Sequence, residues 1–134
     1  MKIFIDTNVL ISAMLFPGSK TAYVFDYILE THQPVICSYS IDEAYTVFEK
    51  KFPHKLESLK DFFDNLDYEH FISPKTIDEN NYPEMRDPHD VPILASAILS
   101  DSDILLTGDK DFDNLDLKRP LILSPSKYYD LIEN

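Results

Sequence analysis

The sequence has one cysteine, two glycines and no tryptophan among 134 residues. A single cysteine, Cys37, cannot form a disulfide within the chain or build a cysteine zinc site alone. With so little glycine, the chain lacks the glycine-rich phosphate loops of nucleotide-cofactor enzymes. Its apolar runs are too short for a transmembrane helix, and Asp6 ends the first run too early for a signal peptide. We therefore expect no membrane partner and a cytoplasmic location.

Basic residues are also scarce. Twelve lysines and arginines face 24 acidic residues, which gives a formal net charge of −12. Proteins that track the grooves of nucleic acids are usually basic, so charge alone argues against a nucleic-acid partner. The exception is a site where several acids converge on a divalent cation, because the ion reverses the local charge. The distribution of the acids therefore matters more than their number.

Short apolar segments alternate with amphipathic helical segments along the chain. The expected strands cover residues 2–5, 34–37, 68–72, 103–107 and 121–123. This alternation predicts an α/β fold: a three-layer, doubly wound, mostly parallel sheet with helices on both faces. The chain shows no repeat or linker, so we expect a single domain over residues 1–134.

Acidic residues follow the predicted strands. Asp6 comes directly after the first strand, and Glu43 lies in the first turn of the helix expected after the second. Asp109 follows the 103–107 strand, and Asp87 and Asp90 begin the helix that precedes it. Ligands of open α/β sheets bind beyond the carboxyl ends of the strands. The pattern therefore points several acids toward one edge of the sheet.

Helix capping is the alternative explanation for each acid. Asp6 suits the N-cap of a helix beginning near Asn8, and Ser40 with Glu43 matches a capping box. Asp87 followed by Pro88 also resembles a helix start, and Asp109 and Asp111 suit turns. A shared site explains the gathering of all four segments better than four independent caps do.

A carboxylate cluster suits Mg²⁺ or Mn²⁺, because these hard cations take oxygen ligands. Such ions hold a phosphodiester and generate a hydroxide from water. No serine–histidine–aspartate or cysteine–histidine arrangement competes, and the four histidines lack a metal-binding spacing. His89 lies between two candidate acids but is more simply a surface residue, and Cys37 is more simply a core residue.

Taken in order, these motifs resemble the PIN domain family. The matching segments are IFIDTNVL at 3–10, Ser40 with Glu43, Asp90 with Ala95 and Ala97, TGDKDF at 107–112 and ILSP at 122–125. The DPHD stretch at 87–90 and the TGDKD form resemble a prokaryotic branch of toxin components of toxin–antitoxin pairs. The resemblance implies a ribonuclease that uses Mg²⁺ or Mn²⁺ to hydrolyse RNA phosphodiester bonds.

The resemblance also implies roles for individual residues. The catalytic acids would be Asp6, Glu43, Asp90 and Asp109. Asp6, Asp90 and Asp109 would bind the metal, and Glu43 would be a further ligand or would orient the attacking water. Asp111 would be an outer metal ligand, and Thr7 and Asn8 would steady Asp6 by hydrogen bonding. The chain contains no inhibitory segment, so an antitoxin would be a separate protein, and a homodimer is compatible with this branch.

Pro92 leaves the choice between Asp87 and Asp90 open. If Asp87 is the N-cap, Pro92 is the fifth helical residue and a backbone hydrogen bond is lost. If the helix starts at Asp90, that carboxylate is spent on capping and Asp87 becomes the rival ligand. The spacing to Ala95 and Ala97 favours Asp90.

RNA would approach such a site through the metal ion, assisted by small basic patches. The candidate patches are Lys50 with Lys51 and Lys55, and Lys110 with Lys118 and Arg119, although ordinary solvated surface explains both. Exposed tyrosines would stack on single-stranded bases.

Two other functions fit parts of the pattern. In a non-catalytic PIN-like module that binds RNA or protein, the acids would serve mainly as caps. A phosphoryl-acceptor domain would need a lysine after the last strand, and Lys127 is poorly placed for that.

Overall fold

A computed structural model describes residues 1–133 and contains a five-stranded, all-parallel sheet in the order β3-β2-β1-β4-β5. The strands are β1 (Lys2–Ile5), β2 (Gln33–Cys37), β3 (Glu69–Phe71), β4 (Ile104–Leu106) and β5 (Leu121–Leu123). The expected strands and the parallel, doubly wound arrangement are confirmed. The chain leaves β1 toward β2 and β3, then returns to place β4 on the other side of β1. The crevice where ligands bind in such sheets therefore lies at the carboxyl ends of β1 and β4.

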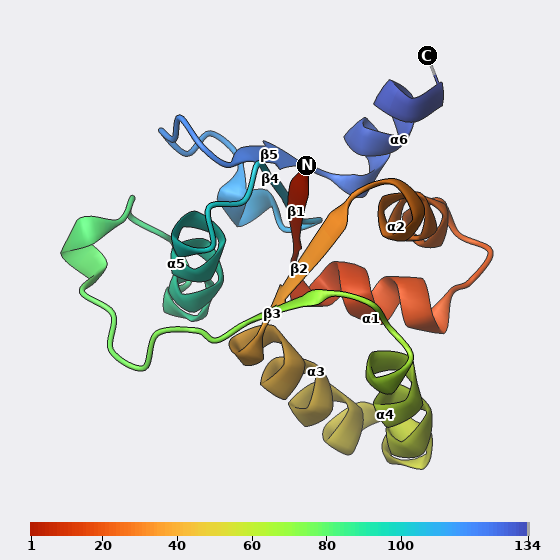
Figure 1. Ribbon diagram of the computed structural model, residues 1–134. Coiled ribbons are helices and arrows are strands. Elements are labelled where there is room, and N and C mark those ends of the chain that lie inside the picture. Colours follow the sequence, from red (N-terminus) through yellow and green to blue (C-terminus); the bar gives the residue numbers. More distant parts are fainter. Residues whose placement is uncertain (134) are drawn as a thin grey trace.

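Helices cover both faces of the sheet, as expected, but unequally (Figure 1). One face packs against α1 (Thr7–Leu15), α2 (Lys20–Thr31), α3 (Ser38–Lys51), α4 (Leu56–Asp64) and α6 (Pro125–Glu133). The other face packs against α5 (Val91–Leu99) and the loops beside it. Alternation along β1 explains the two cores, since Ile3 and Ile5 point to the first face and Phe4 to the second.

The capping box expected at Ser40 and Glu43 is wrong. Helix α3 begins two residues earlier, at Ser38, because β2 runs directly into it and Cys37 is the N-cap. Ser40 is buried, with its Oγ 3.3 Å from Cys37 Sγ, and it caps nothing. Glu43 therefore lies in the second helical turn rather than the first, and its carboxylate is not used for capping.

Pro92 causes no break in α5. Asp87 caps a short 3₁₀ helix, η3 (Pro88–Asp90), and α5 follows directly with Pro92 as its second residue. The first amides of a helix have no intrahelical partner, so proline costs no hydrogen bond at this position. Asp90 occupies the N-cap position of α5 but makes no side-chain capping bond. The sequence predicted either a hydrogen bond lost at Pro92 or an Asp90 carboxylate used for capping. The structure shows neither of these.

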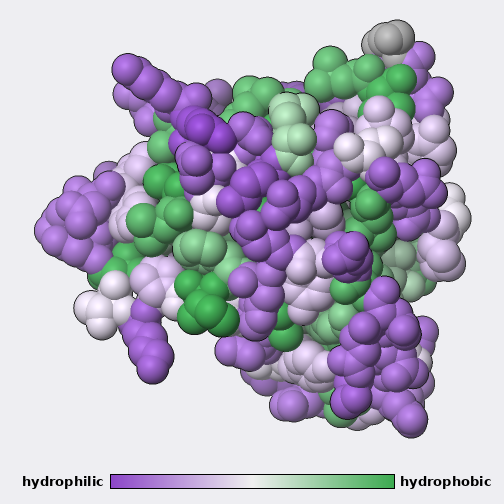
Figure 2. Space-filling view, in the orientation of Figure 1, coloured by the Kyte–Doolittle hydropathy of each residue, from purple (hydrophilic) through white to green (hydrophobic). Residues whose placement is uncertain are grey.

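Among residues 1–133, no helix has the length and apolar character that crossing a bilayer requires. The face of the molecule in Figure 2 is mostly hydrophilic, with apolar residues in small separate areas. This surface agrees with the large excess of acidic residues.

Candidate metal centre

The carboxyl edge of the sheet gathers acids from separate segments. Asp90, Asp109 and Asp111 each place a carboxylate oxygen within 4.8 Å of the other two. Asp6 and Glu43 lie outside this group of three, yet the charges of Glu43 and Asp109 both raise the pKa of Asp6. The acids expected at this edge are therefore neighbours in space.

Asp6 is the most buried of these acids, with 5% of its surface exposed. Its Oδ1 accepts a 2.7 Å hydrogen bond from the backbone N–H of Thr7, so it also caps α1. Its Oδ2 accepts a 2.7 Å bond from the hydroxyl of Thr107. Burial raises the pKa of Asp6 to about 6, against the opposing effect of these two hydrogen bonds. Each oxygen keeps a second lone pair, so capping does not prevent Asp6 from binding a metal.

The carboxylate oxygen Oδ2 of Asp90 is buried and accepts no hydrogen bond from an N–H or hydroxyl group among residues 1–133, and only a proton shared with the neighbouring carboxyl groups of Asp109 and Asp111 reaches this side chain. Burial, followed by the charges of Asp109 and Asp87, raises the pKa of Asp90 to about 7. A buried polar atom without a partner is rare and calls for an explanation. A hard cation would supply one, because this set of neighbouring donors consists of carboxylate oxygens.

Unlike Asp90, Asp87 has hydrogen-bond contacts that engage its carboxylate. Its Oδ1 accepts a 3.0 Å hydrogen bond from the backbone N–H of His89 and lies 3.1 Å from Nδ1 of the same residue. These contacts lower the pKa of Asp87, the backbone bond most strongly. The geometry favours Asp90 over Asp87 as a ligand, although the assignment stays a prediction.

Asp109 and Asp111 lie on the loop after β4. Asp109 Oδ1 accepts a 2.9 Å bond from the backbone N–H of Asp111 and caps the 3₁₀ helix η4 (Lys110–Phe112). Asp111 binds Arg86 through two bonds, Nε to Oδ1 at 2.8 Å and Nη2 to Oδ2 at 2.9 Å. Hydrogen bonding to Arg86 lowers the pKa of Asp111. Asp111 is thus less available to a metal than Asp90.

The contacts that orient Asp6 differ in part from expectation. Thr7 contributes its backbone amide, while its hydroxyl is buried and has no hydrogen-bond partner within residues 1–133. Asn8 was expected to bond Asp6, but its Oδ1 instead accepts a 3.3 Å bond from the backbone N–H of Gly108. The unpredicted residue is Thr107, whose hydroxyl donates to Asp6 and accepts a 3.0 Å bond from the Asp109 amide. Thr107 therefore links the two acids, and its position in the TGD segment was the available signal.

The expected basic patches do not lie together beside this site. Lys50 and Lys51 end α3, about 10 Å farther along the helix than Glu43. Arg119 forms ion pairs with Asp101 and Asp103, which precede β4 at the opposite edge of the sheet. Of the second patch, Lys110 is the member on η4, between Asp109 and Asp111.

The pKa values of Asp6 and Asp90 predict how stability depends on pH without metal. Both groups keep a proton in the folded protein up to pH 6 or 7, whereas the unfolded chain releases it near the ordinary value of 3.8. The folded state binds more protons in this range, so stability falls as pH rises from about 4 to about 7. Asp6 alone contributes about 3 kcal/mol to this loss.

Thermal melting in EDTA at pH 5 and pH 8 measures this effect. We expect the lower melting temperature at pH 8. The lowered pKa values of Asp87, Asp103 and Asp111 act below pH 3.8, outside this window. Partial burial lowers the pKa of His32, and this residue acts weakly in the opposite direction. A melting temperature that is unchanged or higher at pH 8 would contradict the described burial of Asp6.

Comparisons with known proteins agree with this arrangement. The sequence profile of a PIN domain matches residues 2–111. The fold is similar to a chain in the crystal structure of VapBC2 from Rickettsia felis bound to a DNA fragment from their promoter, with a TM-score of 0.69. The two are 15% identical over 92% of this chain and 98% of that chain, a likeness of fold alone. No curated protein matches the chain.

Proposed function

Because this chain belongs to the PIN domain family, we propose that it is an endoribonuclease that depends on a divalent metal ion. The observation that carries the proposal is the carboxylate group of Asp90, Asp109 and Asp111, together with the unpartnered buried oxygen of Asp90.

The residues proposed to hold Mg²⁺ or Mn²⁺ are Asp6, Asp90 and Asp109, and Glu43 either joins them or acts on the attacking water. Both oxygens of Asp111 are engaged by Arg86, which suits a peripheral position. A bound divalent ion would offset the repulsion among the carboxylates, stabilise charge on the phosphodiester and make water more acidic.

Glu43 is the acid best suited to act on the attacking water. Its carboxylate makes no hydrogen bond or ion pair with any other residue in the described range, and it is half-buried near Asp6. A carboxylate in this state is free to orient a water molecule or accept its proton. Thr107 keeps Asp6 and the backbone of Asp109 in position through its two hydrogen bonds. It is proposed to take no part in proton transfer.

The test is incubation of the purified protein with single-stranded RNA and with DNA of the same sequence, in Mn²⁺, Mg²⁺ or EDTA. We expect metal-dependent cleavage of RNA by water. Products that end in a 5′-phosphate and a 3′-hydroxyl would exclude attack by the neighbouring 2′-hydroxyl, because that attack expels the 5′-oxygen instead. Equal cleavage of DNA would overturn the choice of RNA, and undiminished cleavage in EDTA would overturn the metal.

The proposed biological setting is a toxin whose partner is a separate antitoxin protein. The DPHD and TGDKD segments support it, and so does the resemblance of fold to a chain of VapBC2. Expression in a bacterial host tests it: wild type should arrest growth and Asp6→Asn should not. Light scattering on the purified protein tests the predicted homodimer.

A non-catalytic PIN-like binding module remains the second candidate, because Asp6, Asp87 and Asp109 do act as helix caps. It requires no metal, so a melting temperature that Mn²⁺ leaves unchanged would favour it.

A further inference from the structure

Arg86 lies beside the group of three acids formed by Asp90, Asp109 and Asp111. Its guanidinium contacts Asp111, and its side chain is 80% exposed whereas that of Asp111 is 16% exposed. Within residues 1–133, Arg86 is the only lysine or arginine that forms an ion pair with one of the candidate site acids. A cation that reaches solvent beside a carboxylate cluster is well placed to meet an anionic ligand.

The ion pair uses only one side of the guanidinium. Nε and Nη2 each donate to Asp111, and Arg86 makes no other hydrogen bond within the described chain. A guanidinium carries five N–H donors in one plane. The pairing leaves the Nη1 group and the outer N–H of Nη2, which together form a second fork of the kind that binds phosphate.

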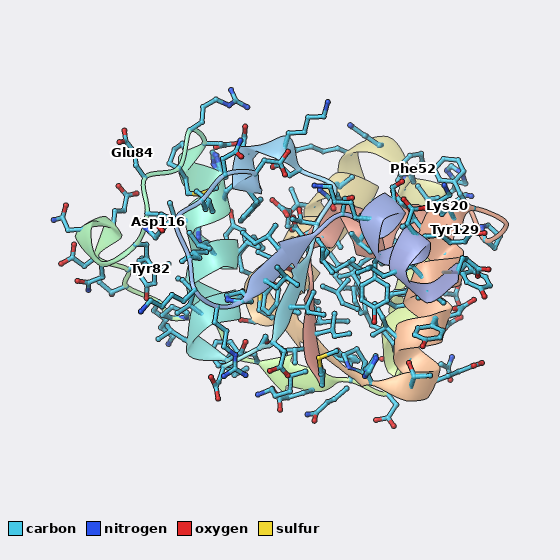
Figure 3. All side chains as sticks on the ribbon, turned by 90° about the horizontal axis from the view of Figure 1, so that it is seen from above. Lys20, Phe52, Tyr82, Glu84, Asp116 and Tyr129 are labelled. Carbon is cyan, nitrogen blue, oxygen red and sulfur yellow. The ribbon has the colours of Figure 1, made fainter. Side chains whose placement is uncertain are left out.

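The segment that carries Arg86 is anchored on both sides. Tyr82 and Met85 pack against the core on the α5 face, and Asp87 caps η3 immediately after Arg86. Figure 3 shows Tyr82 and Glu84 of this segment on the opposite side of the sheet from Lys20 and Tyr129. The backbone anchors and the Asp111 contact together fix the direction of the guanidinium.

We propose that Arg86 binds a phosphodiester oxygen of the RNA strand through this second fork, while Asp111 holds the guanidinium in place. The inference rests on the proposed ribonuclease function and deepens it. It also gives Asp111 a role other than metal binding: Asp111 is the residue that positions the arginine.

The test is binding of a fluorescent single-stranded RNA in Mn²⁺ by protein that carries Glu43→Gln, which blocks activation of the attacking water and leaves the three aspartates to hold the metal. Adding Arg86→Gln should weaken binding about tenfold or more. It should also reduce the slope of log affinity against log salt by about 0.7, the value for one phosphate contact on a single strand. Lys50→Gln removes an exposed charge at the far end of α3 and serves as the matched control, with little change expected.

Arg86→Lys separates charge from geometry. It should keep the salt slope and still bind several-fold more weakly, because lysine lacks the planar fork. Both Arg86 variants should melt within about 3 °C of the parent, since an exposed ion pair stabilises little.

Binding by Arg86→Gln that equals binding by Lys50→Gln would overturn this inference alone. Full affinity in Arg86→Lys would overturn the second fork. If the Glu43→Gln protein binds no RNA in Mn²⁺ whatever stands at position 86, both this inference and the proposed RNA substrate are overturned.

Discussion

Asp6→Asn is expected to reduce RNA cleavage roughly a thousandfold or more, equivalent to about 4 kcal/mol in the activation barrier. Asp6 follows the central strand β1 at the point where the strand order reverses, next to Glu43 and Asp109. Asparagine keeps the shape and can still accept the Thr7 hydrogen bond, but it lacks the charge that a metal ligand must supply. The measurement is the cleavage rate in saturating Mn²⁺.

The same substitution should not harm folding. Burial already raises the pKa of Asp6, so the ionised carboxylate destabilises the metal-free fold at pH 8. Asparagine removes this charge, and we expect an equal or higher melting temperature in EDTA at pH 8. The matched control is Asp26→Asn on the exposed side of α2, which should keep wild-type cleavage. Full activity in folded Asp6→Asn would contradict the role given to this residue.

Phe112→Ala should produce the largest loss of stability, about 3–5 kcal/mol. Phe112 is the last residue of η4, is fully buried and packs into the core on the α5 face. Its side chain therefore anchors the loop that carries Asp109 and Asp111. Removing the ring leaves a cavity, and denaturant unfolding in EDTA measures the cost.

Phe16→Ala is the control for the loss of a phenylalanine ring. Phe16 is 61% exposed at the end of α1, so its removal should cost less than about 1 kcal/mol. Similar losses for the two variants would show that Phe112 does not anchor the loop as described. Phe112→Leu should keep most of the stability while weakening Mn²⁺ binding, because the loop acids shift.

The three inner strands β1, β2 and β4 could be predicted because each contains a short buried apolar run, and burial on both faces leaves a clear mark in the sequence. The edge strands β3 and β5 are more exposed and left a weaker mark. The start of α3 could not be predicted. A serine three residues before a glutamate is the usual mark of a helix start, but here β2 passes into α3 without a loop. The tertiary path of the chain overrode the local capping signal at Ser40.

The position of the candidate site follows from topology, since Asp6 comes directly after β1 and Asp109 comes three residues after the adjacent parallel strand β4. The hydrogen bonds and the ion pair that orient the acids could not be predicted in the same way. Arg86 and Asp111 are 25 residues apart, and Thr107 reaches Asp6 across 101 residues. Such pairs depend on how loops pack, and although the TGD segment draws attention to Thr107, no local pattern in the sequence names the partner of either residue. Asn8 illustrates the same limit, because its partner is an amide of the β4 loop rather than its neighbour Asp6.

Mn²⁺ binding by the metal-free protein tests the central claim most directly, because it depends on neither the substrate nor a partner. The signal of free Mn²⁺ in electron paramagnetic resonance falls as the ion binds, and it can be followed for wild type, Asp90→Asn and the exposed control Asp116→Asn. The predicted result is saturable binding by wild type and Asp116→Asn, with affinity at least tenfold lower in Asp90→Asn. Equal binding by all three folded proteins, or none by wild type, would contradict a metal centre at these acids.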